Sequence, residues 1–188
     1  MRRNICKHVM AILFLFFAAI AIPASKVNAE NNVIANSVTI GSYTTEFDSI
    51  KSARGQNIKL AAEKIDKVII LPGQEFSFNK AVGPSTEKRG FKLAKVFING
   101  EEHEGFGGGI CQVSSTLYNA VMEAGLSISE RHEHSKDVKY VPEGKDATAS
   151  YGGVDFKFHN DSYYPIVIRA KTDGNKVTVD VEAVLGFE

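Results

Sequence analysis

The residue of this sequence best suited to do chemistry is Cys111, which follows the three consecutive glycines Gly107, Gly108 and Gly109. An apolar pattern with helical spacing begins beside it, so we expect the thiol at the N-terminus of a helix. Free backbone N–H groups and the helix dipole favour the thiolate over the thiol at such a position. Cys111 is therefore the first candidate for a nucleophile.

A cysteine nucleophile needs a base that takes its proton and a third group that orients the base. The best-placed histidines are His132 and His134, because both follow the Cys111 helix within residues 129–135, which we expect to form one strand. Alternate residues of a strand share a face, so Glu130 and the two histidines would line up together. The sequence alone leaves the choice between the two histidines open.

The remaining parts of such a site would be an orienting carboxylate and a substrate groove. Asp146 and Asp155 lie in later segments, and no spacing rule selects between them. Glycine N–H groups beside the cysteine could stabilise an oxyanion. The candidate substrate-binding residues around the cysteine are Gly107, Gly108, Gly109, Gln112, Ser114, Ser115 and Tyr118.

Two other interpretations of the same residues stay open. Cys111, His132 and His134 could form a three-ligand zinc site with Glu130 as the base. The sequence has no CxxC or HExxH pattern, so we expect no metal or other cofactor. A lone cysteine is also often a buried core residue, although the polar neighbour Gln112 argues for a polar rim here.

The first 29 residues have the pattern of a secretory signal peptide. A basic start precedes an apolar stretch over residues 9–22, and small residues precede position 30. This stretch of 14 residues is shorter than the roughly 20 that a membrane-spanning helix needs, so we expect export without a stable membrane anchor after cleavage. Cleavage would remove Cys6, which leaves one cysteine and no intramolecular disulfide.

The charge balance argues against a nucleic-acid partner. The whole chain has 22 basic and 22 acidic residues, and residues 1–29 hold four basic and no acidic ones, so the rest carries a net charge of −4. No basic stripe is present, whereas nucleic-acid-binding surfaces are basic.

The apolar patterns predict an α+β fold with a largely antiparallel sheet and two main helices, the cysteine lying at the start of the second. Helices are expected over residues 52–67 and 110–124, the second ending at Gly125. We expect residues 30–49 to form a polar segment and a strand ahead of a domain at 50–188. The expected strands are 38–47, 68–71, 76–78, 91–98, 129–135, 138–141, 147–151, 156–159, 164–171 and 177–184, with a loop at 82–90, a turn at 99–100 and a connecting acidic run at 101–104.

Several of these stretches together resemble the VanW family, named for a vancomycin-resistance-associated protein. The matching stretches are residues 71–79, 82–84, 90–91, 107–118, 130–135, 140–149 and 151–152, with Asp155 and Asn160. They run from about residue 50 to 170, in an order and over a length that are highly specific for this family.

The resemblance implies an exported, cell-wall-associated protein of a Gram-positive-type bacterium. Some members of the family are described as cysteine-dependent L,D-transpeptidases, which join peptidoglycan stem peptides through a thioester. That likeness would make Cys111 the nucleophile, His134 the base with His132 as second choice, and Asp146 the orienting carboxylate. The alternatives are a non-catalytic peptidoglycan- or glycopeptide-binding module and a zinc-dependent amidase or peptidase.

Overall fold

The computed structural model describes residues 36–98 and 101–186. The predicted signal peptide and the predicted turn at 99–100 lie outside these residues. Within them, no helix has the length and apolar character needed to cross a membrane. The elements are β1 (Ser37–Glu46), α1 (Ala53–Ile65), β2 (Ile69–Ile70), β3 (Glu75–Ser77), α2 (Phe78–Val82), the 3-10 helix η1 (Glu87–Arg89), β4 (Leu93–Ile98), β5 (Glu101–Phe106), α3 (Ile110–Glu123), β6 (Ser127–Glu130), β7 (Lys157–His159), β8 (Ile166–Asp173) and β9 (Lys176–Val184).

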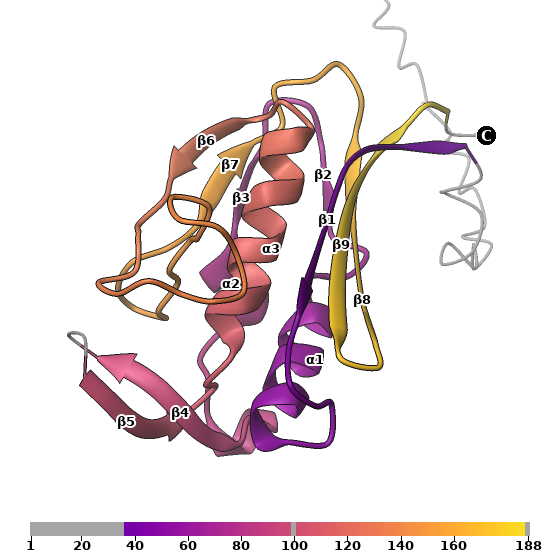
Figure 1. Cartoon of the computed structure of the whole chain (residues 1–188). Coiled ribbons are helices and arrows are strands. Elements are labelled where there is room, and N and C mark those ends of the chain that lie inside the picture. Colours follow the sequence, from indigo (N-terminus) through magenta and orange to yellow (C-terminus); the bar gives the residue numbers. More distant parts are fainter. Residues whose placement is uncertain (1–35, 99–100, 187–188) are drawn as a thin grey trace, which may run out of the picture. The chain divides into compact units, whose positions relative to one another are not determined.

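The described strands form three sheets in which every pair is antiparallel. The largest sheet has the order β1-β9-β8-β2, a second has the order β3-β7-β6, and β4 pairs with β5 alone (Figure 1). The predicted α+β class with antiparallel sheets is therefore confirmed. The two main helices are α1 and α3, and the five-residue α2 lies between them in the chain.

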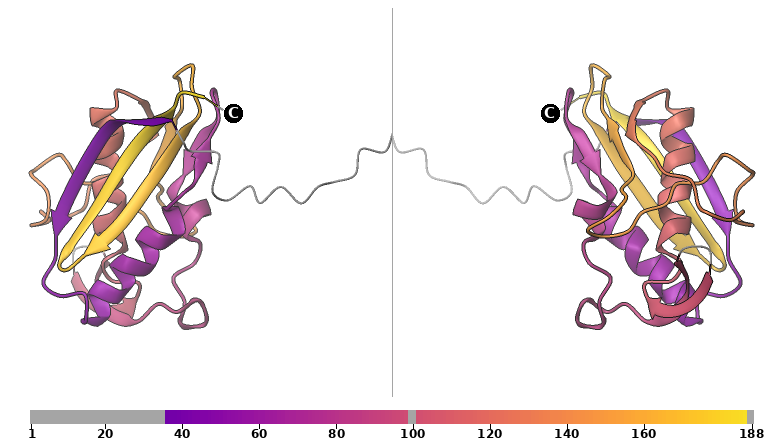
Figure 2. Two further views of the ribbon diagram at one scale, coloured as in Figure 1. Left: turned by 90° about the vertical axis from the view of Figure 1, so that its right-hand side faces the viewer. Right: turned by 90° about the vertical axis from the view of Figure 1, so that its left-hand side faces the viewer.

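Helices α1 and α3 cover one face of the four-stranded sheet (Figure 2). In β9, Val177, Val179 and Val181 alternate towards the core and are fully buried, as the two-residue period of a strand requires. Gly41 lets β1 lie directly against α3, because a Cβ there would be 2.1 Å from the carbonyl oxygen of Ala120. This close approach packs the middle of α3 against the sheet.

Helix α3 is buried on nearly all sides, since it lies between the four-stranded sheet and the β3-β7-β6 side of the fold (Figure 1). Its ten residues from 112 to 121 are all buried, polar ones included. Ser114 donates to the carbonyl oxygen of Ala147 at 2.6 Å, and Asn119 donates to that of Lys145 at 2.6 Å. These bonds replace water for the buried polar groups and fix residues 145–147 along the helix.

The structure corrects the expected strand at residues 129–135, which ends as β6 at Glu130. Residues 138–141 and 147–151 are not strands either. Their backbone groups form isolated bonds and no ladder: Thr148 N–H donates to the carbonyl oxygen of His132 at 2.8 Å, and Ala147 N–H donates to Ser115 Oγ at 2.9 Å. The alternation rule therefore does not apply beyond β6, and His134 does not share a strand face with its neighbours.

Two other local predictions were wrong. The acidic run expected to be a connection is strand β5, which pairs in register with β4. Phe78 begins α2 and does not continue the strand, because Ser77 caps this helix by accepting from Lys80 N–H at 3.1 Å. The Asp155 carboxylate accepts from Asn79 N–H at 2.9 Å, which satisfies another donor of the first turn.

Candidate active site

Cys111 is the second residue of α3, and the three glycines before it bring this helix start close to other backbone. A Cβ on Gly108 would be 2.3 Å from the carbonyl oxygen of Lys95, and one on Gly109 would be 3.0 Å from Arg54 Cγ. Gly109 also has a φ of 109°, a conformation that side chains disfavour. The glycines thus serve close packing against β4 and α1, a role that the sequence analysis did not foresee.

A buried asparagine fixes this glycine turn in place. Asn57 of α1 is fully buried and donates from Nδ2 to the carbonyl oxygens of Gly108 and Lys92, each at 3.0 Å. Its Oδ1 accepts from Lys92 N–H at 2.7 Å. One side chain therefore joins α1, the chain entering β4 and the approach to Cys111.

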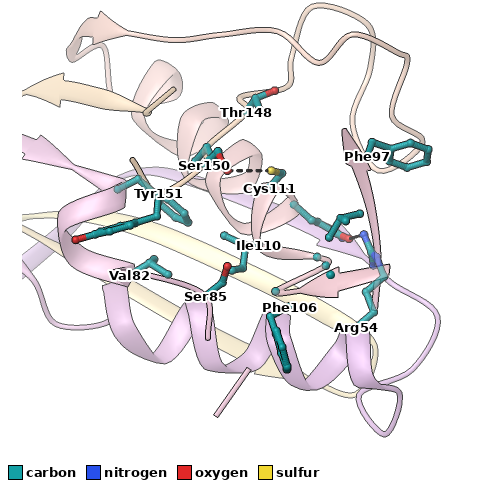
Figure 3. Close-up of a pocket in the computed structure, with 18 of the residues that line it drawn as sticks. Arg54, Val82, Ser85, Phe97, Phe106, Ile110, Cys111, Thr148, Ser150 and Tyr151 are labelled. Carbon is teal, nitrogen blue, oxygen red and sulfur yellow. Dashed lines mark hydrogen bonds between the residues drawn. The ribbon is translucent and has the colours of Figure 1, made fainter. Parts of the chain in front are cut away.

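Cys111 lies at a pocket of about 380 Å³ (Figure 3). The cysteine is half-buried, and its Sγ donates to the carbonyl oxygen of Ala149 at 3.4 Å. Phe97 and Tyr151 lie on opposite sides of the pocket and expose 60% and 58% of their surface. The sulfur is thus accessible from a cavity with an aromatic rim, and is not sealed in the apolar core.

His134 is the histidine at this pocket, and Asp146 holds its ring. The Nδ1 atom lies 2.5 Å from Asp146 Oδ2, and the same oxygen accepts from the backbone N–H of His134 at 2.7 Å. With Nδ1 engaged, Nε2 is the ring nitrogen left to exchange a proton with the cysteine. The structure therefore places His134 between Asp146 and the pocket that Cys111 lines, an arrangement that suits a nucleophile, a base and an orienting carboxylate.

The contact between His134 and Asp146 shifts the pKa of each residue towards its charged form. Burial alone would lower the pKa of His134, but its interactions with Cys111 and then with Asp146 outweigh burial and raise the pKa above 6.5. Burial would raise the pKa of Asp146, but the backbone and ring N–H groups of His134 outweigh it and lower the pKa below 3.8. An anionic Asp146 beside a readily protonated imidazole suits the stabilisation of a cysteine thiolate.

Arg131 and Tyr140 complete the surroundings of this pair. Arg131 Nη2 donates to Asp146 Oδ1 at 3.0 Å, and its Nε donates to the carbonyl oxygen of the same residue at 2.7 Å. The Tyr140 ring lies edge-on to His134 with 6.4 Å between centroids. Burial raises the pKa of Tyr140, so its hydroxyl stays neutral at physiological pH. Arg131 thus fixes the carboxylate that holds His134, and Tyr140 packs against the imidazole ring.

The second candidate base, His132, is placed elsewhere. Its Nε2 lies 3.1 Å from Glu130 Oε1, the side chain is 45% exposed, and it does not line the pocket. Glu130 also pairs with Lys157 at 2.7 Å, a contact that heads the causes lowering its pKa to about 2. Within the described residues, no three His, Cys, Asp or Glu side chains converge as metal ligands, so Cys111, His132 and His134 do not form the zinc site considered above.

Several expected groove residues do not face the pocket. The three glycines and Gln112 line it, whereas Ser114, Ser115 and Tyr118 are buried along α3. The Tyr118 ring packs edge-on against Phe156. The guanidinium carbon of Arg131 lies over the same ring, 5.2 Å from its centroid. The reason for the difference is that segment 131–150 covers the face of α3 that sequence patterns left open.

Three site residues were missed by the sequence analysis: Arg54, Asn57 and Tyr140. Arg54 and Tyr140 line the pocket, and the guanidinium lies 6.0 Å from the Tyr140 ring centroid. Only Tyr140 carried a usable signal, since it begins one of the stretches that resemble the family. Arg54 and Asn57 lie in the first two turns of α1, where polar residues are ordinarily solvent-exposed.

The fold and site together define an α+β domain with a cysteine–histidine–aspartate arrangement in an aromatic-rimmed pocket. The family model described as VanW like protein matches residues 53–182, and the chain belongs to this family. The predicted family resemblance is therefore confirmed.

Two curated relatives are similar over most of this chain. The protein YoaR of Bacillus subtilis (strain 168) is 47% identical over 154 residues, which cover 82% of this chain and 51% of YoaR. The vancomycin B-type resistance protein VanW of Enterococcus faecalis (strain ATCC 700802 / V583) is 33% identical over 149 residues, which cover 75% of this chain and 54% of that protein. The chain thus spans about half the length of these relatives. No solved structure matches it significantly.

Proposed function

We propose that this protein is an exported, cell-wall-associated enzyme that uses Cys111 for acyl transfer on peptidoglycan stem peptides. The observation that carries the proposal is the imidazole of His134, which Asp146 holds through Nδ1 and which lines the same open pocket as Cys111. A structural cysteine in an apolar core would need neither a polarised histidine nor an accessible cavity. The vancomycin resistance for which the Enterococcus relative is named is consistent with a role at the cell wall.

The proposed reaction has two halves. The Cys111 thiolate attacks a peptide carbonyl carbon and forms the C–S bond, and protonated His134 gives its proton to the leaving amine as the C–N bond breaks. An incoming amine, or water, then attacks the thioester while His134 takes its proton. The C–S bond breaks, the new amide or acid leaves, and the thiolate is regenerated.

The oxyanion of each tetrahedral intermediate would lie at the start of α3. The N–H groups of Ile110 and Gln112 already donate to Gly107 and Gly109 carbonyl oxygens, each at 3.0 Å. The Cys111 N–H between them is the donor that this arrangement directs to the reacting carbonyl. The positive end of the helix dipole adds to the same stabilisation.

The test is muropeptide analysis of purified sacculi incubated with wild type, Cys111→Ser and His134→Ala proteins. We expect new cross-links or trimmed stems with wild type, none with Cys111→Ser, and a rate at least 100-fold lower with His134→Ala, the usual contribution of a general base. His132→Ala is the matched control and should retain the wild-type rate within about twofold. Identical muropeptide profiles for wild type and Cys111→Ser would contradict the proposal and leave a binding module.

A further inference from the structure

Among the described residues, those that line the pocket beside Cys111 include cationic side chains but no carboxylates. Arg54, Lys95 and His134 line it, and none of its lining residues is an aspartate or glutamate. Two of the three cations have a carboxylate partner: Lys95 pairs with Glu102 at 2.6 Å, and His134 with Asp146. Arg54 forms no ion pair with any carboxylate in the described part of the chain.

The guanidinium of Arg54 is half-buried and held by a neutral partner. Its Nη2 donates to Gln112 Oε1 at 2.7 Å. Gln112 is 1% exposed and is itself fixed, because Nε2 donates to Thr45 Oγ1 at 2.9 Å and to the carbonyl oxygen of Glu46 at 2.8 Å. These hydrogen bonds thus position Arg54 beside Gln112, the residue that follows the nucleophile.

The positive charge of Arg54 is only partly balanced by neighbouring groups. Burial lowers the pKa of Arg54, and the nearby negative or polar groups Tyr140, Asp48 and Cys111 only partly offset that effect. Formation of a thioester would neutralise the sulfur and remove one of these compensating groups. A guanidinium offers five N–H donors in a planar fork that fits a carboxylate, and Gln112 occupies only one nitrogen.

We propose that Arg54 binds a free carboxylate of the acyl-donor peptide and thereby selects acidic substrates. This inference rests on the proposed function, since it assigns the substrate chemistry of the same pocket. Because Gln112 follows Cys111 directly, the bound carboxylate lies close to the scissile bond. It belongs either to the C-terminal residue that leaves or to an internal acidic residue of the peptide, and both sources share the same recognition chemistry.

The experiment measures binding without chemistry, by titration calorimetry with the Cys111→Ala protein. The probes are one synthetic stem tetrapeptide with all carboxylates free, the same peptide as its C-terminal amide, and the same peptide with its internal carboxylate amidated. We expect one of the two amidations to weaken binding about tenfold or more, and that amidation identifies the source of the carboxylate.

Variants of Arg54 test whether this residue causes the preference for the free carboxylate. Adding Arg54→Gln, which removes the charge, should abolish the difference between the acid and that amide. Arg54→Lys keeps the positive charge but lacks the planar guanidinium, so it should retain a reduced preference for the free carboxylate. This variant also provides the test if Arg54→Gln fails to fold. Lys95→Gln, at the other lysine or arginine of the pocket, is the matched control and should keep the full difference.

An unchanged preference in both Arg54 variants, equal binding of all three peptides, or no binding of any of them would overturn the inference. These results are independent of turnover. An acid preference that depends on Arg54 would therefore stand even if muropeptide analysis showed no reaction, and loss of that preference would leave a cysteine-dependent reaction unaffected.

Discussion

Replacing Asp146 by asparagine isolates the charge that holds His134. Asp146 accepts from the ring and the backbone of His134 and from Arg131, and these three side chains are 10%, 13% and 18% exposed, in that order. Asparagine keeps the shape but removes the charge and turns one acceptor into a donor. Removing one partner of a buried ion pair costs about 3 kcal/mol of unfolding free energy, which corresponds to a fall in Tm of about 6–12 °C for a domain of this size.

The pH dependence of this loss follows from the two pKa shifts. The pKa of Asp146 is lowered, so its contribution is fully present above 3.8 and is lost as pH falls through the lowered value. The pKa of His134 is raised, so its contribution is fully present below 6.5 and is lost as pH rises through the raised value. The difference between wild type and Asp146→Asn should therefore be largest between about pH 4 and 6.5.

The assay is urea unfolding at a series of pH values, followed by far-UV circular dichroism and by tyrosine fluorescence, since the chain has six tyrosines and no tryptophan. Glu133→Gln is the matched control, because Glu133 also contacts Arg131, at 2.7 Å, but is 67% exposed. That exposed pair should contribute no more than about 0.5 kcal/mol. An equal loss in both variants, or a loss in Asp146→Asn that does not vary with pH, would refute the reasoning.

Three further outcomes follow from the packing around the site. Gly108→Ala should destabilise the protein by at least about 2 kcal/mol in thermal unfolding, because its Cβ would be 2.3 Å from the carbonyl oxygen of Lys95; Gly153→Ala, with 3.6 Å to its nearest neighbour, should be nearly neutral. Asn57→Ala removes the three hydrogen bonds of a buried side chain and should lower the unfolding free energy by about 3 kcal/mol in urea titration. Tyr140→Ala should slow any Cys111-dependent turnover at least about tenfold, and Tyr140→Phe, which keeps the ring contacts, by less than about threefold.

The sequence predicted the elements with a clear apolar period. The helix expected at 110–124 is α3, ending before Gly125 with a φ of 72°, and the strand expected at 177–184 is β9. Both have an uninterrupted buried face, which is the feature that periodicity detects. The family resemblance rested on motifs and not on periodicity, and the match of the family model to residues 53–182 confirms it.

The segment after β6 could not be predicted in the same way. Residues 131–155 form almost no backbone ladder, because side chains such as Ser115 and Asp146 satisfy their backbone groups. Such bonds join residues far apart in the chain and have no period. For the same reason the residue pattern alone could not tell which of His132 and His134 faces the cysteine, although the family resemblance placed His134 first.

The central claim, that His134 and not His132 activates Cys111, is tested most directly by iodoacetamide alkylation at pH 7. Peptide mapping separates Cys111 from Cys6 and gives the rate at the pocket cysteine alone. The account predicts that His134→Ala slows alkylation at least about tenfold and that His132→Ala leaves the rate within about twofold of wild type. Equal rates in all three proteins, or slowing by His132→Ala alone, would contradict it.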